Sequence, residues 1–85
     1  MGERIKTIVM TASAARMFDA LPTAAQQQIA AGLDLYATTG AGDIKALQGQ
    51  AGYRLRIGRY RVLFAEDRQT ILVIQLGKRE TTTYR

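Results

Sequence analysis

Closely spaced arginines are the residues of this sequence with the clearest capacity for chemistry. They come in two pairs, each separated by one uncharged residue: Arg54 and Arg56, then Arg59 and Arg61. Side chains two positions apart on a strand point to the same face of a sheet. A guanidinium group donates hydrogen bonds in a planar fork that fits phosphate and carboxylate groups. The segment therefore predicts a surface that grips an anionic partner.

The distribution of charge supports this prediction. The net charge is +5, and residues 43–85 carry nine cationic and four anionic side chains, whereas residues 1–42 carry three of each. Such asymmetry favours a polyanionic partner, which is a nucleic acid, an anionic membrane or an acidic protein. Adjacent like charges on a sheet cost about 0.2–1 kcal/mol per pair, which a bound anion would relieve. The alternative is a solvated face whose long side chains cover apolar surface.

Several classes of chemistry are disfavoured by composition. The sequence has no histidine and no cysteine, so it lacks the usual general base, the commonest zinc ligands and any disulfide. We expect no metal and no other cofactor. Residues 1–10 lack the apolar run of a secretory signal, and the longest apolar segment, Ile71 to Leu76, is interrupted by Gln75 and too short to span a bilayer. We expect a cytoplasmic protein without a membrane partner.

The arginines need strands to hold them in place. Alternation predicts four strands, at Arg4–Met10, Tyr53–Ile57, Arg59–Glu66 and Thr70–Leu76. The connections between the last three are so short that they predict antiparallel hairpins. The last strand is apolar on both faces, so we expect it to be central.

Two helices are predicted between the first and second strands. The first covers about Ser13 to Leu21 and is capped by Thr11 or Ser13, and the single proline ends it. Thr23 is expected to cap the second helix, about Ala24 to Ala37. The segment Lys45–Gly52 is expected to be irregular.

The predicted fold is therefore a single α+β domain, residues 1–85, in the order β-α-α-β-β-β. The antiparallel sheet has four strands, or five if the tail adds a short C-terminal strand, and a helical hairpin covers one face. If the apolar faces align on the helices, the open face carries Arg54, Arg56 and Arg61 together, with Lys78 and Arg79 near the end of an adjacent strand.

The segment Tyr53–Phe64, the Gly77-Lys78-Arg79 ending and the late Tyr84 resemble the RelE/ParE toxin superfamily, and more closely its RelE-like branch. The resemblance covers nearly the whole chain. Members of the superfamily are toxins of type II toxin–antitoxin pairs. RelE-like members cleave messenger RNA in the ribosomal A site, with the ribose 2′-hydroxyl as nucleophile and no metal. ParE-like members inhibit DNA gyrase.

This resemblance implies an mRNA endonuclease (an mRNA interferase) that acts on ribosome-bound mRNA, inhibits translation and arrests growth. The alternative is a ParE-like gyrase inhibitor that acts by protein–protein contact. The implied partners are a cognate antitoxin encoded by an adjacent gene, the ribosome and mRNA, with DNA contacted only through the antitoxin. Arg61 and Arg79 are assigned phosphate clamping and charge neutralisation, and Tyr84 base stacking or ribose orientation, unless it only packs the tail. RNA binding falls to Arg54, Arg56 and Arg59.

One departure from the RelE-like pattern affects the proposed catalysis. RelE-like enzymes commonly carry lysines where this chain has Arg54 and Arg56, and arginine keeps its proton in proteins. Lys78 and Tyr84 are then the candidates for proton transfer. A slower nuclease, a nuclease with rearranged roles and a protein that is not a nuclease all stay open.

Overall fold

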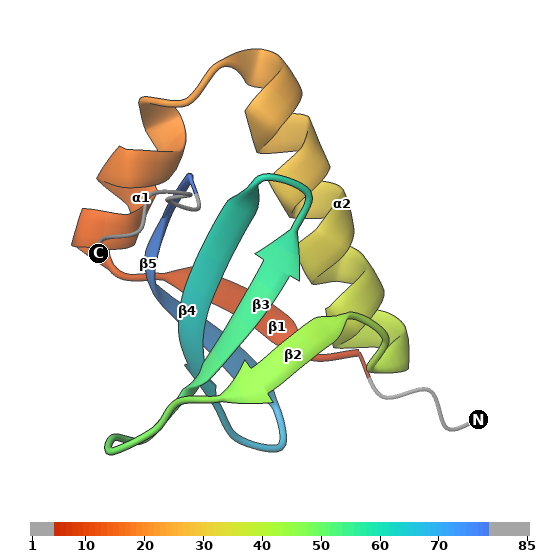
Figure 1. Cartoon of the computed structure of the whole chain (residues 1–85). Coiled ribbons are helices and arrows are strands. Elements are labelled where there is room, and N and C mark those ends of the chain that lie inside the picture. Colours follow the sequence, from red (N-terminus) through yellow and green to blue (C-terminus); the bar gives the residue numbers. More distant parts are fainter. Residues whose placement is uncertain (1–4, 79–85) are drawn as a thin grey trace.

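The computed structural model describes residues 5–78 and confirms the predicted α+β class (Figure 1). The elements follow one another as β1 (Thr7–Met10), α1 (Ala12–Asp19), α2 (Thr23–Thr39), β2 (Asp43–Ala46), β3 (Tyr53–Ile57), β4 (Tyr60–Glu66) and β5 (Thr70–Lys78). Neither of the helices in this part of the chain is long and apolar enough to cross a membrane.

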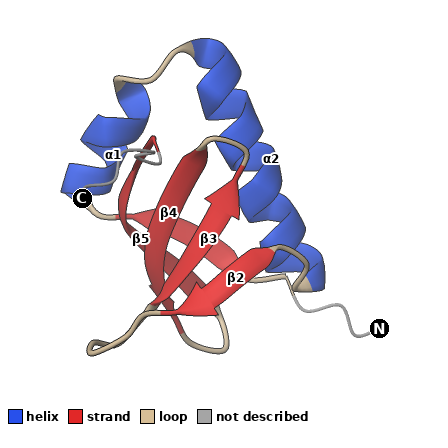
Figure 2. Cartoon of the chain, in the orientation of Figure 1, coloured by secondary structure: helices blue, strands red, loops and turns tan. Residues whose placement is uncertain are grey.

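The five strands form one sheet in the order β1-β5-β4-β3-β2. The last four of these are labelled side by side in Figure 2. The hairpins β3–β4 and β4–β5 are antiparallel, as the short connections predict, and β5 lies inside the sheet between β1 and β4. β1 pairs with β5 in the parallel sense, so the sheet is mixed rather than wholly antiparallel. A parallel pair needs a long crossover connection, and here the intervening helices and hairpins supply it.

The fifth described strand is β2, which no pattern predicted. Its last two residues, Lys45 and Ala46, lie in the segment Lys45–Gly52 that was expected to be irregular, so that expectation is wrong at these two positions. It pairs with β3 so that Ile44 faces Leu55. Ile44 is half-buried, whereas the other three residues of β2 are exposed. Its sequence, Asp-Ile-Lys-Ala, alternates polar and apolar residues, but four residues are the shortest run in which alternation indicates a strand. The short C-terminal strand that we considered falls outside the described residues.

Helix α1 begins after Thr11, whose Oγ1 accepts a hydrogen bond of 3.1 Å from the backbone N–H of Ala14. Of the two residues predicted as alternative caps of this helix, Thr11 and Ser13, the cap is therefore Thr11. The cap predicted at Thr23 is wrong, because Thr23 already lies in α2 and Pro22 occupies the cap position without a side-chain hydrogen bond. α2 ends at Gly40, whose φ of 80° is the left-handed conformation that favours glycine at this position.

Both helices cover the same face of the sheet and diverge from their connection (Figure 2). Their buried side chains meet those of the central strands in one core. At its centre Phe64 is fully buried, with ring centroids 5.5 Å from Tyr36 and 5.7 Å from Tyr53. The fully buried large side chains are Phe64, Ile29, Leu33, Leu55, Ile71, Val62 and Val73. Within residues 5–78 the opposite face of the sheet has no helix on it, and this face carries Arg54, Arg56 and Arg61.

A carboxylate at the end of β4 ties three segments together. Glu66 accepts a hydrogen bond of 2.8 Å from Lys6 Nζ and another of 2.8 Å from Tyr36 Oη. The pKa of Tyr36 is raised from 10.0 to about 12, first because burial disfavours the phenolate and then because Glu66 accepts the phenol's proton in a hydrogen bond. Glu66 thus joins β4 to α2 and to the residue before β1.

We expect Tyr36→Phe to lower the free energy of unfolding by about 1.5 kcal/mol near neutral pH, since it removes one hydrogen bond to a charged group. The folded protein holds this proton to a higher pH than the unfolded chain does. The contribution is therefore present below pH 10 and is lost as the pH rises through about 12. Urea unfolding should show that the free energy of unfolding falls less between about pH 8 and about pH 11 in the variant than in the wild type. Equal declines in both proteins would contradict this account.

Candidate functional site

The uncovered face of the sheet presents its side chains in rows that run across the strands. In the first row, Arg56 of β3 lies directly opposite Arg61 of β4, and Arg61 lies opposite Gly77 of β5. Asp43 of β2 ends the row beside Arg56. The second row contains Lys45, Arg54, Leu63 and Gln75. We call these two sets the basic rows.

The structure thus brings Arg54, Arg56 and Arg61 onto one face, where strand alternation places them. The intervening Leu55 and Val62 are buried under the helices. Two guanidinium groups on directly paired residues can approach the same anion, and each offers a planar fork of donors. Their assignment to RNA stays a prediction at this point.

The three arginines differ in their surroundings. The Arg54 side chain is only 17% exposed, its terminal nitrogen lies 4.0 Å from Asp43 Oδ1, and its buried Nε has no hydrogen-bond partner among the described residues. Because Asp43 is largely exposed and the distance is long, this ion pair stabilises little. Arg56 and Arg61 are exposed and have no carboxylate within 4.0 Å in residues 5–78. Arg56 and Arg61 are therefore the cations best placed to receive a ligand.

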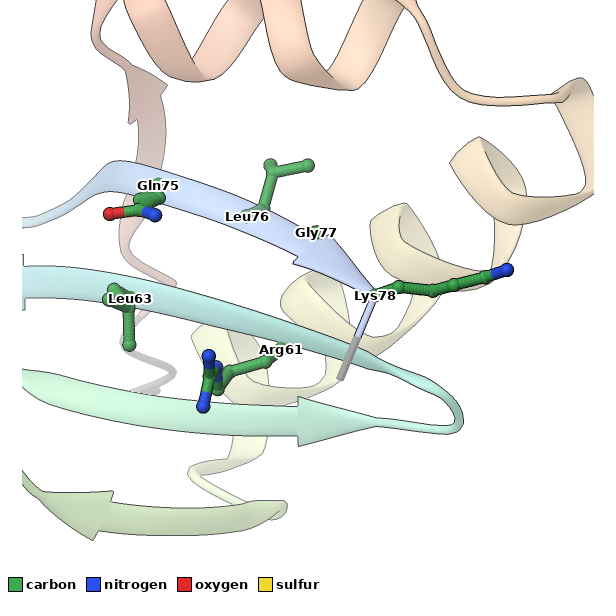
Figure 3. A pocket seen from close by; sticks show the side chains of 6 residues that line it. All are labelled: Arg61, Leu63, Gln75, Leu76, Gly77 and Lys78. Atoms are coloured by element: carbon green, nitrogen blue, oxygen red, sulfur yellow. The ribbon is translucent and has the colours of Figure 1, made fainter. Parts of the chain in front are cut away.

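A small hollow of about 80 Å³ lies beside Arg61 on this face (Figure 3). Arg61, Leu63 and Gln75 project on its side of the sheet, while Leu76 points the other way, toward the helices. Lys78 also lines the hollow, but its side chain extends past the end of the strand and away from Arg61. Lys78 pairs with Tyr60, so alternation directs it to the opposite face from Arg61. The structure does not bring the Lys78 amine to the arginines.

The remaining predicted site residues lie elsewhere. Arg59 is exposed in a two-residue turn rather than in a strand, because β4 begins at Tyr60. Gly58 opens this turn with a φ of 60°, the arrangement of a type II′ hairpin. Arg59 therefore stands at the end of the sheet, outside the rows. Arg79 and Tyr84 lie outside the described residues.

Sequence reasoning did not single out Gln75 or Gly77 as site residues. Both face the hollow because β5 has a bulge: Leu63 pairs with Gln75 and Phe64 with Val73, which leaves Ile74 as an extra residue. The signal for Gln75 is its position as one amide in an otherwise apolar strand. The bulge itself has no marker in the sequence.

Beyond the basic rows the uncovered face becomes apolar. Ala65 lies opposite Leu72, which lies opposite Val9, and we call these three residues the apolar row. A second hollow, of about 350 Å³, lies along this row. It is bounded by Asp67, whose carboxylate accepts hydrogen bonds of 2.8 Å from the backbone N–H groups of Gln69 and Thr70. These bonds lower the pKa of Asp67 and fix the β4–β5 turn.

The described residues contain no cluster of three or more side chains that could together hold a metal ion. What the face offers in residues 5–78 is positive charge, hydrogen-bond donors and an adjoining apolar surface.

The fold and this face define a small basic α+β protein of RelE-like architecture. A chain of the RelBE2 toxin–antitoxin complex from Mycobacterium tuberculosis is 22% identical, with a TM-score of 0.75 over 88% of this chain and 92% of that chain. A chain of the archaeal RelE–RelB complex from Pyrococcus horikoshii is 20% identical, with a TM-score of 0.74 over 91% and 98%. A chain of the RelB–RelE antitoxin–toxin complex from Methanococcus jannaschii is 17% identical, with a TM-score of 0.68 over 82% and 88%. No protein-family model and no curated protein sequence matches this chain.

Proposed function

We propose that this protein is the toxin of a type II toxin–antitoxin pair, from the RelE-like branch of the RelE/ParE superfamily. Its fold is found in chains of RelE–RelB complexes from three organisms. Two of these complexes, from Mycobacterium tuberculosis and Methanococcus jannaschii, are toxin–antitoxin complexes. Since one fold can host many functions, the site has to carry the rest of the proposal.

The activity we propose is metal-independent cleavage of ribosome-bound mRNA, in the cytoplasm. Attack by a ribose 2′-hydroxyl requires in-line positioning of the phosphate and stabilisation of the charge that develops on it. The observation that carries the proposal is the direct pairing of Arg56 with Arg61 on the uncovered face. Two exposed guanidinium groups side by side provide that charge stabilisation. Arg79 would add a third cation and Tyr84 would orient the base or ribose.

One observation favours a second candidate, inhibition of DNA gyrase by protein–protein contact. Within residues 5–78, the residues paired with Arg61 in its row are Arg56 and Gly77, and the Lys78 side chain points away from Arg61. None of the three is placed to take a proton from a 2′-hydroxyl. In the nuclease, proton transfer would fall to Tyr84 or to Lys78 after its side chain turns toward Arg61.

A purified translation system separates the two candidates. The full chain should cut a ribosome-bound message at discrete positions and leave supercoiling by purified gyrase unaffected. Intact message together with lost supercoiling would replace the nuclease by the gyrase inhibitor. If neither changes, the toxin assignment fails.

We infer that the cognate antitoxin, encoded next to this gene, covers the apolar row and reaches the basic rows. Val9 and Leu72 expose 43% and 36% of their surface on the uncovered face. A polypeptide with apolar side chains followed by acidic ones matches both halves of this face, whereas an RNA backbone matches only the basic half. Along β4 the two halves are continuous, because Arg61, Leu63 and Ala65 are successive side chains on that face. Contact with DNA would belong to the antitoxin.

A further inference from the structure

Gly77 occupies a position where the described chain does not require glycine. It lies in β5, and it is not among the glycines with positive φ, so any residue could adopt its backbone conformation. Glycine weakens a strand by roughly 0.5–1 kcal/mol relative to alanine, because it loses more conformational freedom on folding. Its presence here needs another explanation.

Packing within residues 5–78 does not supply that explanation. A Cβ atom built on Gly77 would meet no heavy atom of the described chain within 4 Å. The contrast is Gly32 in α2, where a Cβ atom would lie 2.7 Å from Ile57 Cδ1. Gly32 is required by the approach of the helix to the sheet, whereas within residues 5–78 Gly77 borders open space.

That open space is the hollow beside Arg61. Gly77 is the direct cross-strand neighbour of Arg61, and Leu63 and Gln75 form the adjoining wall (Figure 3). A side chain at position 77 on this face would extend into the hollow. With a volume of about 80 Å³, the hollow is far smaller than the roughly 300–1,000 Å³ of pockets that enclose whole small molecules. It fits one small group rather than a nucleotide.

We propose that Gly77 is a specificity-determining residue whose missing side chain leaves room for one phosphodiester group of an RNA strand against Arg61. Arg61 donates charge-assisted hydrogen bonds to the phosphate oxygens, and the Gln75 amide, at the same wall, donates a further one. The inference rests on the proposed function in that it takes RNA as the ligand of the basic rows. It adds a steric requirement that excludes any side chain at this position.

The test compares Gly77→Ala and Gly77→Val with the wild-type full chain. The probe is a short fluorescein-labelled oligoribonucleotide, and binding is measured by fluorescence anisotropy at fixed low salt. We expect a graded loss, with Gly77→Val weaker by about tenfold or more, since this is the scale of one lost hydrogen bond to a charged group. Thermal unfolding should show that both variants are at least as stable as the wild type.

Ala46→Val is the matched control. Ala46 is an exposed strand residue whose partner, Tyr53, packs on the core side, so the added bulk stays off the basic rows. This variant should bind the probe like the wild type. Equal binding by all four proteins overturns the inference, and so does a fall in melting temperature for Gly77→Ala, which would show that the fold needs the glycine.

The outcome is independent of the nuclease assay. A wild-type protein that binds the probe in a Gly77-dependent manner but cuts no message would refute the proposed cleavage and support the phosphodiester subsite. A protein that cuts ribosome-bound message with Gly77→Val as well as with glycine would support the function and refute the subsite.

Discussion

Arg61→Ala is expected to slow the proposed cleavage of ribosome-bound mRNA by at least about a hundredfold, the effect of removing one donor that stabilises a charged transition state. Arg61 is the exposed cation between Arg56 and Gly77 and lies beside the hollow, so it is the residue most directly placed on a bound phosphate. The rate should be measured as single-turnover cleavage in a purified translation system, so that product release does not mask the chemical step.

Two further variants make this result specific to the guanidinium group at position 61. Arg68→Ala removes the same charge from the exposed β4–β5 turn and should leave the rate unchanged. Arg61→Lys retains the charge but loses the planar fork, so its rate should fall between those of the wild type and Arg61→Ala. Arg61 and Arg68 are both exposed, so all these variants should have the melting temperature of the wild type. If Arg61→Ala cuts the message at the wild-type rate, the basic rows take no part in cleavage.

The parts of the site that sequence could predict are those set by strand alternation. Arg54, Arg56 and Arg61 flank apolar residues in a hairpin with a two-residue turn. The period of two then fixes their face once Leu55 and Val62 are buried. Arg59 follows the same spacing but was misplaced, because the turn at Gly58 takes it out of the strand. Local patterning predicts faces well within strands and poorly at their ends.

What sequence could not predict depends on tertiary pairing. The bulge at Ile74 shifts the register of β5 and brings Gln75 opposite Leu63. The polar edge strand β2 brings Asp43 beside Arg54 and Arg56, where it offsets part of the positive charge. Lys78 was expected near the arginines from its place in the chain, yet its pairing with Tyr60 directs it to the other face. Each of these facts follows from how strands pair, which no single segment encodes.

The apolar row allows the proposed binding of an antitoxin to be tested separately from the proposed cleavage of mRNA. Leu72→Glu places a charge at the centre of this row, between Ala65 and Val9, without touching the basic rows. We expect affinity for the antitoxin to fall by about thirtyfold or more, as for a buried anchor residue at an interface. The variant should still cut ribosome-bound message, so co-expressed antitoxin should no longer restore growth. Affinity can be measured by isothermal titration calorimetry with the purified antitoxin.

Leu35→Glu is the control for this change, since Leu35 is an exposed leucine on α2, with 53% of its surface accessible, and lies outside the uncovered sheet face. It introduces the same charge and should leave antitoxin binding intact. Val9→Ser tests the same row by truncation and should weaken the complex less than Leu72→Glu does, because it adds no charge to the interface. If Leu72→Glu has the melting temperature of the wild type and still binds the antitoxin as tightly, the partner does not cover the apolar row. The proposed antitoxin would then have to neutralise this protein through the arginines alone, in direct competition with RNA.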